Sequence, residues 1–190
     1  GKRKPDQIVI LNNLSKEEYT NSPEYLEVIS RYHQTFRLIL SKSKQLGFAE
    51  ARNRAVSLCT KDFIAILDDD CEPDEYWLDE LYQTLQNFDA VGGGVFPPGF
   101  IRTPADWDSE LNWVVGLSPP SQFADRYGIV SHPSTSNMAF RKEVFQEIKF
   151  QEIGGGLERP DQGSNYLIGR EDAQYWKSIR QSGFKTCNHP

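Results

Sequence analysis

The apolar run FIAIL, residues 63–67, passes without interruption into three consecutive aspartates, Asp68, Asp69 and Asp70. A short apolar run of this kind predicts a buried strand. Neighbouring carboxylates repel one another, and partial burial makes that repulsion more costly. The strand must therefore end at a place where the three charges are solvated or are neutralised by a bound cation.

Other predicted strands and helices alternate along the first half of the chain. Short apolar runs predict strands at 7–11, 36–40, 63–67 and 90–96. Helical periodicity and start signals, such as Ser22 followed by Pro23, predict helices at 22–34, 48–59 and 74–87. Strands joined by helices require crossover connections. The sequence therefore predicts an α/β domain over 1–190, with a mostly parallel sheet and helices on both faces.

The second half of the chain shows a less regular pattern. Helices are predicted at 104–117, at 142–148 and at 169–183, where Gly183 ends the last one. Strands are predicted at 135–141 and 184–188, and residues 118–134 read as a loop.

Composition excludes several classes of function. The net charge is −6, and the only basic cluster is Lys2-Arg3-Lys4, so nucleic acid is not the expected partner. The three cysteines form no metal-binding or disulfide pattern, which favours a reducing, cytoplasmic setting. No apolar stretch is long enough to cross a bilayer. In a longer parent chain we expect a place at the inner face of the membrane.

The aspartates have two interpretations. In an open parallel sheet, ligands bind beyond the carboxyl ends of the strands, and carboxylate oxygens suit Mg²⁺ or Mn²⁺, with substrate phosphates completing the shell. Alternatively, the triplet is an acidic turn before a helix whose first turn, with Glu72, Asp74 and Glu75, favours negative charge.

Longer stretches of the chain resemble the family 2 glycosyltransferases, which have the GT-A fold. The first stretch is LGFAEARNRAVSLCTKDFIAILDDDCEPDEYWLDEL, with Ala-Arg-Asn on a helix before an apolar strand that runs into a DxD motif. Three further stretches follow in the family's order: STSNMAFRKEVF, FQEIGGG and GREDAQYWKSIRQSGFK. The similarity extends over nearly the whole chain from residue 6. Residues 6–100 correspond to the nucleotide-sugar-binding half and 101–190 to the acceptor-side half.

The resemblance implies a metal-dependent, inverting transfer from a UDP- or GDP-type sugar donor to a carbohydrate or lipid-linked acceptor. Asp70 and Asp68 correspond to the metal-binding pair, with Mn²⁺ or Mg²⁺, and Asp68 or Asp69 lies nearer the donor. Asp172 corresponds to the general base, and Glu171 positions the acceptor. In isolation, Glu171 and Asp172 would be read as favourable charge in a helical first turn.

Several further residues keep two interpretations each. Arg52 and Asn53 either contact the nucleotide, or Arg52 is solvated and Asn53 stabilises a turn. Arg141 either binds the diphosphate or only pairs with a carboxylate. Ser136 and Asn137 face the sugar or satisfy the strand end. Trp107 and Trp113 form a stacking platform for an acceptor sugar, or at least one of them packs in the core. His132 and His189 are lone histidines, and His189 is a metal-facing side chain or a turn residue.

The chain departs from the family pattern at its start. The strand at 7–11 corresponds to the family's second strand, and nothing before it corresponds to the first. Asn12 and Asn13 replace the acidic pair expected near the base. Without a first strand, two strands would expose unpaired edges, so we expect association of copies of the chain.

Three other functions remain as alternatives. An aspartyl phosphatase would need Thr or Val where Glu72 stands, and a nucleotidyltransferase would need an N-terminal glycine-rich phosphate loop. A non-catalytic carbohydrate-binding or scaffold fragment is the third alternative. Carboxylates that repel one another at a strand end have no use in such a scaffold, which favours the transferase.

Overall fold

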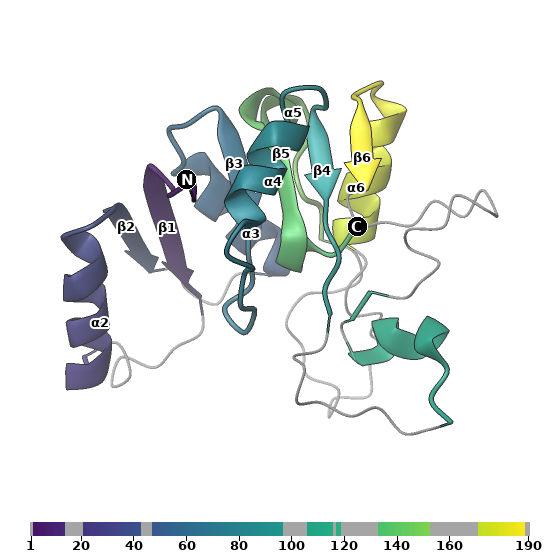
Figure 1. The fold of residues 1–190 in the computed structure, drawn as a ribbon. Coiled ribbons are helices and arrows are strands. Elements are labelled where there is room, and N and C mark those ends of the chain that lie inside the picture. The colour runs from purple at the N-terminus through teal and green to yellow at the C-terminus, as the bar shows by residue number, and fades with distance from the viewer. Residues whose placement is uncertain are drawn as a thin grey trace.

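The computed structural model describes residues 2–13, 21–42, 47–96, 106–115, 117–118, 133–152 and 171–188. These residues form an α/β arrangement of two sheets flanked by helices (Figure 1), which confirms the predicted fold class. Among the described helices, none has the length and hydropathy needed to cross a bilayer.

The larger sheet has four strands in the order β3-β5-β4-β6. They are β3 (Phe63–Ile66), β5 (Met138–Arg141), β4 (Ala90–Gly92) and β6 (Thr186–Asn188). β5 is antiparallel to both β3 and β4, whereas β4 and β6 are parallel. Three of the four strands therefore run in one direction. β5 runs in the opposite direction, and the short turn η4 (Thr135–Asn137) leads directly into it.

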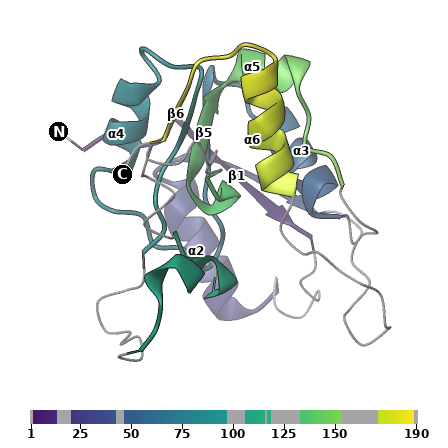
Figure 2. The ribbon, with the colours of Figure 1, turned by 90° about the vertical axis from the view of Figure 1, so that its right-hand side faces the viewer.

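Side chains alternate between the two faces of this sheet, as the two-residue period of a strand requires. Ile64, Met138 and Phe140 belong to a large core that includes residues of α3 (Phe48–Ser57) and α6 (Glu171–Gln181). Val91 and Ala139 belong to a smaller core with residues of α4 (Trp77–Thr84). Figure 2 shows α4 on one side of the strands and α3 and α6 on the other.

The smaller sheet consists of β1 (Gln7–Asn12) and β2 (Arg37–Lys42), which pair in parallel, with α2 (Pro23–His33) beside β2. Ser22 caps α2, as predicted, by accepting a hydrogen bond from the Tyr25 amide at 3.2 Å. Within the described residues, β1 pairs only with β2, and β3 pairs only with β5. Each of these two strands therefore has one edge that pairs with no other strand in the described part of the chain.

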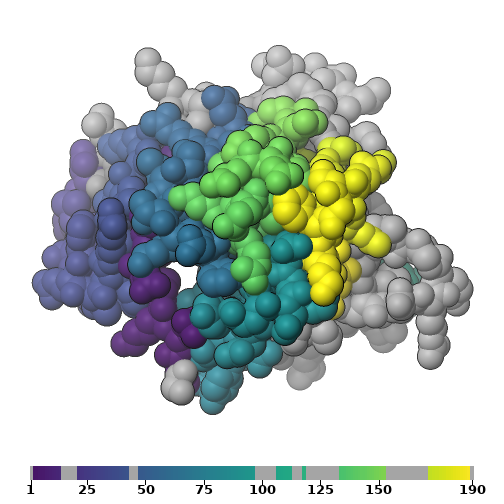
Figure 3. All heavy atoms as spheres, turned by 90° about the horizontal axis from the view of Figure 1, so that it is seen from above, coloured from purple at the N-terminus to yellow at the C-terminus, as the bar shows by residue number. Residues whose placement is uncertain are grey.

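A side chain, and not a backbone ladder, connects β1 to the segment before β3. Gln7 donates to the Leu58 carbonyl at 3.3 Å and accepts from the Thr60 amide at 2.9 Å. Figure 3 shows an opening between the purple N-terminal residues and the blue residues of the α3–β3 region. The two sheets are thus linked near Gln7 without a shared backbone ladder.

Two predicted helices differ from the structure. α4 begins at Trp77 and not at residue 74, because Asp74 accepts hydrogen bonds from the amides of Tyr76 (side chain, 2.9 Å) and Trp77 (carbonyl, 3.1 Å). Between 106 and 115 the structure has a 3₁₀ helix, η1 (Ser109–Val115), in place of an α-helix. The short helix α5 (Lys142–Glu147) and the end of α6 before Gly183, whose φ is +85°, match the predictions.

Candidate active site

Three chain segments meet at one edge of the larger sheet. Asp68 follows the end of β3, and the η4 turn precedes the start of the antiparallel β5, so both lie at the carboxyl edge of β3. α6 leads into the start of β6, and β6 is parallel to β4. The end of α6 therefore lies at the amino edge of these strands, and its start, at the other end of the helix, lies at the carboxyl edge. The topology therefore brings the aspartates and the Glu171-Asp172 pair to the same edge, as the sequence predicts for an α/β site.

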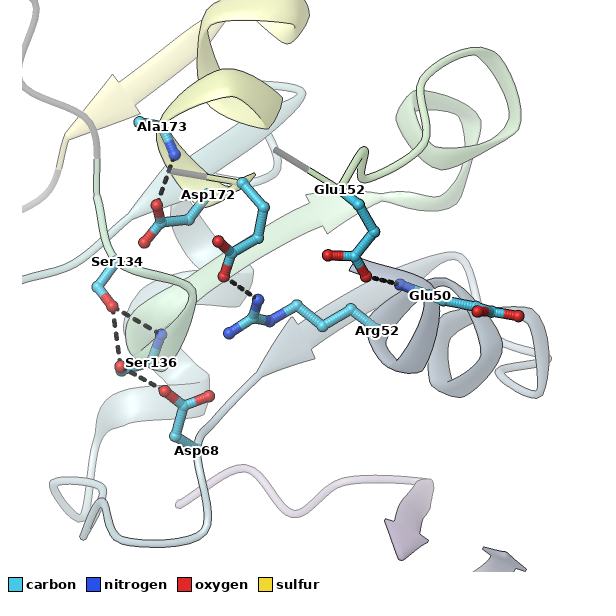
Figure 4. Close-up of polar contacts among 9 residues, drawn as sticks. Glu50, Arg52, Asp68, Ser134, Ser136, Glu152, Asp172 and Ala173 are labelled. Atoms are coloured by element: carbon cyan, nitrogen blue, oxygen red, sulfur yellow. Dashed lines mark hydrogen bonds and ion pairs between the residues drawn. The ribbon is translucent and has the colours of Figure 1, made fainter. Parts of the chain in front are cut away.

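The aspartates occupy a tight turn that is fixed from the neighbouring strand. The Cys71 amide donates to the Asp68 carbonyl at 3.2 Å. The Ser136 hydroxyl donates to Oδ2 of Asp68 at 2.7 Å, and its oxygen lies 2.8 Å from the Ser134 hydroxyl (Figure 4). Because the Ser136 proton is used for Asp68, Ser134 is the donor in the second bond. Asp68 is half-buried, whereas Asp69 and Asp70 are exposed.

Asn137 holds the η4 turn against the end of β4. Its side chain accepts from the Trp77 indole at 2.8 Å and donates to the Gly94 carbonyl at 2.8 Å. A Cβ at position 93 would lie 2.1 Å from Nδ2 of Asn137, so Gly93 is required for this close approach. Asn137 therefore satisfies the strand end, which is one of its two predicted roles.

Asp172 lies in the first turn of α6, where its Oδ1 accepts a hydrogen bond from the Ala173 amide at 2.7 Å. Figure 4 shows Asp172 on the same side of the site as Ser134, Ser136 and Asp68. The neighbouring Glu171 points elsewhere, because its carboxylate pairs with Arg52 at 2.5 Å. The two adjacent acids therefore have different surroundings.

Arg52 and Asn53 both bond within the protein. The Asn53 side chain donates to the Phe150 carbonyl at 2.8 Å and accepts from the Phe150 amide at 3.0 Å. Arg52 pairs with Glu171. The predicted nucleotide contacts of Arg52 and Asn53 stay predictions, and the structure gives each of them an intramolecular role.

Arg141 lies at the opposite edge of the sheet. It is paired in register with Phe63, the first residue of β3, whereas the aspartates follow the last. Its guanidinium donates to the carbonyls of Leu85 and Phe88 at the end of α4 and lies 3.8 Å from the Asp89 carboxylate. This placement corrects the assignment of Arg141 to the diphosphate and supports the alternative of a partner for a carboxylate. The cause is the reversed direction of β5.

The aspartate turn offers hard oxygen donors. Asp68 keeps Oδ1 outside its bond with Ser136, and the Cys71 thiol lies 3.7 Å from Oδ1 of Asp70. Burial and then the charges of Asp70 and Asp68 raise the pKa of the Cys71 thiol. Within the described residues, no group of three or more His, Cys, Asp or Glu side chains could hold a metal ion. A divalent cation held by Asp68 and Asp70 would therefore need further ligands to complete its shell.

The segment around η1 is attached to the end of β4. Ser118 donates its amide to the Val95 carbonyl at 2.8 Å, and its hydroxyl accepts from the Val95 amide at 2.9 Å. Trp107 donates its indole N–H to Asn112 at 3.0 Å, so its polar atom is satisfied locally. The other acceptor-side candidates lie outside the described residues or have undescribed side chains: Trp113, His132, His189 and residues 153–170.

Three residues that shape the site stand in stretches quoted above for the family resemblance, but the sequence assigned no individual role to them. Ser134 supports Ser136, and Phe150 and Glu152 bind α3. Each of them uses a backbone group or a common polar side chain in a loop. The resemblance marks these stretches, but a single sequence does not show which partners their residues contact.

Comparison with known proteins is consistent with this arrangement. Residues 2–149 match the profile described as "Glycosyl transferase family 2". A curated relative, the glucosyl-dolichyl phosphate glucuronosyltransferase of Haloferax volcanii, is 31% identical over 105 residues, which cover 54% of this chain and 33% of the relative. The chain thus spans only a third of that relative's length.

Two solved structures share the fold. The crystal structure of S. aureus TarS 1-349 has a TM-score of 0.59 and 13% identity, covering 96% of this chain and 48% of TarS. The same protein in complex with UDP has a TM-score of 0.57 and 12% identity, covering 99% of this chain and 53% of TarS. The family profile covers most of the chain, and the fold agrees with it. The chain belongs to glycosyl transferase family 2.

Proposed function

We propose that the protein transfers a sugar from a nucleotide diphosphate sugar to an acceptor hydroxyl, with inversion at the anomeric carbon. The observation that supports this proposal is the convergence of Asp68 and Asp172 at one edge of the sheet, from β3 and α6. Asp68 follows β3 and would lie near the donor phosphates, whereas Asp172 lies in the first turn of a separate helix. This separation suits one acid to the leaving group and the other to the nucleophile.

Asp70 and Asp68 would hold Mn²⁺ or Mg²⁺, which would neutralise the negative charge of the diphosphate leaving group. Ser136 fixes one oxygen of Asp68 and leaves the other available to the site. We expect the nucleotide to be UDP, since a protein of the same fold is known in complex with UDP. GDP is the alternative.

Asp172 would act as the general base. As the acceptor oxygen bonds to the anomeric carbon, the bond from that carbon to the diphosphate breaks, and the hydroxyl proton passes to the Asp172 carboxylate. Proton transfer of this kind contributes about 10²–10⁴-fold to a rate. The hydrogen bond from the Ala173 amide holds the Asp172 carboxylate at the first turn of α6, where the helix favours negative charge.

The acceptor is proposed to be a lipid-linked sugar, in polysaccharide or glycoconjugate assembly. The Haloferax volcanii relative is named for glucuronosyl transfer to glucosyl-dolichyl phosphate. UDP-glucuronic acid and a short-chain glucosyl polyprenyl phosphate are therefore the first donor and acceptor to test. All three cysteines are free, which supports a reducing setting. The proposed location is the cytoplasm, at the inner face of the membrane in a longer parent chain.

Association of copies is the second proposal, and it depends on a different observation. Within the described residues, β1 and β3 each have one edge without a hydrogen-bonded neighbour. Unpaired edges are templates for pairing with another strand. Light scattering after size-exclusion chromatography should give a mass above that of the monomer; a monomer at all concentrations would rule out the association.

Titration calorimetry with UDP and then GDP, each with and without Mn²⁺, tests the donor site. We expect binding that requires the metal and is lost in Asp70→Ala but kept in Asp62→Ala, an exposed aspartate before β3. Binding in Asp70→Ala equal to wild type would exclude the proposed donor site. Absence of binding by the folded wild-type chain would favour the scaffold alternative.

A further inference from the structure

We propose that Arg52 is a positioning residue: by pairing with Glu171 it fixes the first turn of α6 to α3 and so holds Asp172 in place. This inference rests on the proposed role of Asp172 as the general base. In this role Arg52 positions the general base on the acceptor side of the site and does not bind the nucleotide.

The ion pair is close and largely removed from water. Nη1 of Arg52 lies 2.5 Å from Oε1 of Glu171, and the two side chains are 18% and 12% exposed. When one partner of a largely buried pair is removed, the other is left as an uncompensated charge, which is strongly destabilising. The contact therefore strongly constrains where the first turn of α6 can lie.

Glu171 transmits this constraint directly to Asp172. The two residues are adjacent in the first turn of α6, and the Asp172 carboxylate is bonded to the next amide, that of Ala173. A shift of Glu171 along the helix or about its axis would therefore move the Asp172 carboxylate with it. A misplacement of about 1 Å in a reacting group can reduce a rate about 100-fold.

α3 is a firm reference because three other contacts anchor it. Ala49 and Val56 are 1% and 2% exposed in the main core. Asn53 exchanges two hydrogen bonds with the backbone of Phe150. At the start of the helix, Glu152 accepts from the Glu50 amide at 3.1 Å, as Figure 4 shows. Arg52 thus extends from a fixed helix to α6.

The same geometry opposes a contact between Arg52 and the donor. Its guanidinium pairs with Glu171 and lies 5.9 Å from the centre of the Phe48 ring. Turning Arg52 toward a phosphate would leave the buried Glu171 carboxylate without this partner. Arg52→Met should therefore affect turnover and not affinity for the nucleotide.

The test compares UDP release from UDP-glucuronic acid with UDP affinity by calorimetry, in Arg52→Met, Arg52→Lys and Arg54→Met. Arg54 is exposed on the same helix and serves as the matched control. We expect Arg52→Met to lower kcat by about tenfold or more while the Kd for UDP stays within about twofold. Arg52→Lys should recover a large part of kcat, and Arg54→Met should behave as wild type.

A double variant keeps the test informative if Arg52→Met does not fold. Arg52→Met combined with Glu171→Gln leaves no unpaired buried charge, and we expect its kcat to be no lower than that of Arg52→Met. A kcat equal to wild type in the double variant would overturn the proposal. A tenfold weaker UDP affinity in Arg52→Met would overturn it as well, because it would make Arg52 a nucleotide ligand.

Hydrogen exchange separates failure of this inference from failure of the proposed function. If the wild-type protein binds UDP but releases none from the sugar donor, the proposed transfer fails. The role of Arg52 is then read from the first-turn amides of α6, which should exchange faster in Arg52→Met than in Arg54→Met. Equal exchange in the two variants would overturn the positioning role.

Discussion

The hydroxyl of Ser136 donates a hydrogen bond to Oδ2 of Asp68 at 2.7 Å, which connects the entrance of β5 to the exit of β3. Ser134 supports Ser136 in turn. Of the three aspartates, Asp68 is the half-buried one, whereas Asp69 and Asp70 are exposed. The strand can run into three carboxylates because the first is hydrogen-bonded and the next two face solvent.

Ser136→Ala should lower kcat/KM by about tenfold or more and leave the fold intact. A hydrogen bond to a charged group contributes about 1.5–3 kcal/mol, and its loss frees the Asp68 carboxylate to turn away from the donor. The measurement is the steady-state rate of UDP release, with thermal unfolding as the check on folding. Ser182→Ala, at an exposed site beyond α6, is the control. A rate equal to wild type in Ser136→Ala would show that Asp68 needs no such support.

Asp172→Asn should abolish turnover while UDP binding persists. The amide retains the shape of the carboxylate but cannot accept the acceptor proton, so we expect a loss of about 10²–10⁴-fold in kcat. Calorimetric affinity for UDP should change by less than about twofold, because Asp172 belongs to a different segment from the aspartate turn. Asp62→Asn is the matched control. Retained turnover in Asp172→Asn would assign the base to another residue.

Arg141→Met should weaken folding and not donor binding. Its guanidinium donates to carbonyls at the end of α4 and lies over the Phe63 ring at 5.1 Å, all at the edge opposite the aspartates. Loss of such hydrogen bonds should lower the free energy of unfolding by about 1–3 kcal/mol. Urea denaturation gives the stability, and calorimetry gives the UDP affinity. A large loss of affinity at full stability would contradict the placement of Arg141.

Tyr175→Phe should change how stability depends on alkaline pH. Tyr175 is 1% exposed, and among the described residues its hydroxyl has no hydrogen-bond partner. Burial raises the pKa of this hydroxyl above its usual value. As the pH rises, the unfolded state therefore loses the Tyr175 proton before the folded state does. The contribution of the protonated hydroxyl to stability is complete below about pH 10, and it is lost as the pH rises further.

The comparison is made by urea denaturation at about pH 8 and about pH 11. At the lower pH, the free energy of unfolding of Tyr175→Phe should match that of wild type within about 1 kcal/mol, because the change removes only an unsatisfied hydroxyl. The ring itself stays stacked on Phe150, with 3.7 Å between the ring centres. Between the two pH values, the free energy of unfolding should fall by about 1.4 kcal/mol less in Tyr175→Phe than in wild type. Tyr32→Phe, at an exposed site, is the control. Identical pH dependence in wild type and Tyr175→Phe would contradict the burial argument.

Local sequence patterns predicted the type and approximate position of most helices and strands. Apolar runs located β1, β2 and β3, and capping signals located the start of α2 and the end of α6. Where local contacts compete with the helix, the pattern was less reliable. The Asp74 turn delays α4, and the η1 segment forms a 3₁₀ helix in place of the predicted α-helix.

The sequence by itself determined that an apolar strand ends in carboxylates and that Glu171 and Asp172 lie near the start of a helix, predicted at 169–183. Each of these signals is local, because the residues that carry it lie within a few positions of one another. Tertiary structure decided which side chains meet there. The reversal of β5 brings Ser136 to Asp68 and takes Arg141 to the far edge, and the packing of α3 against α6 turns Arg52 to Glu171. These contacts join residues far apart in the chain, so strand direction and helix packing set them, and no local pattern records either.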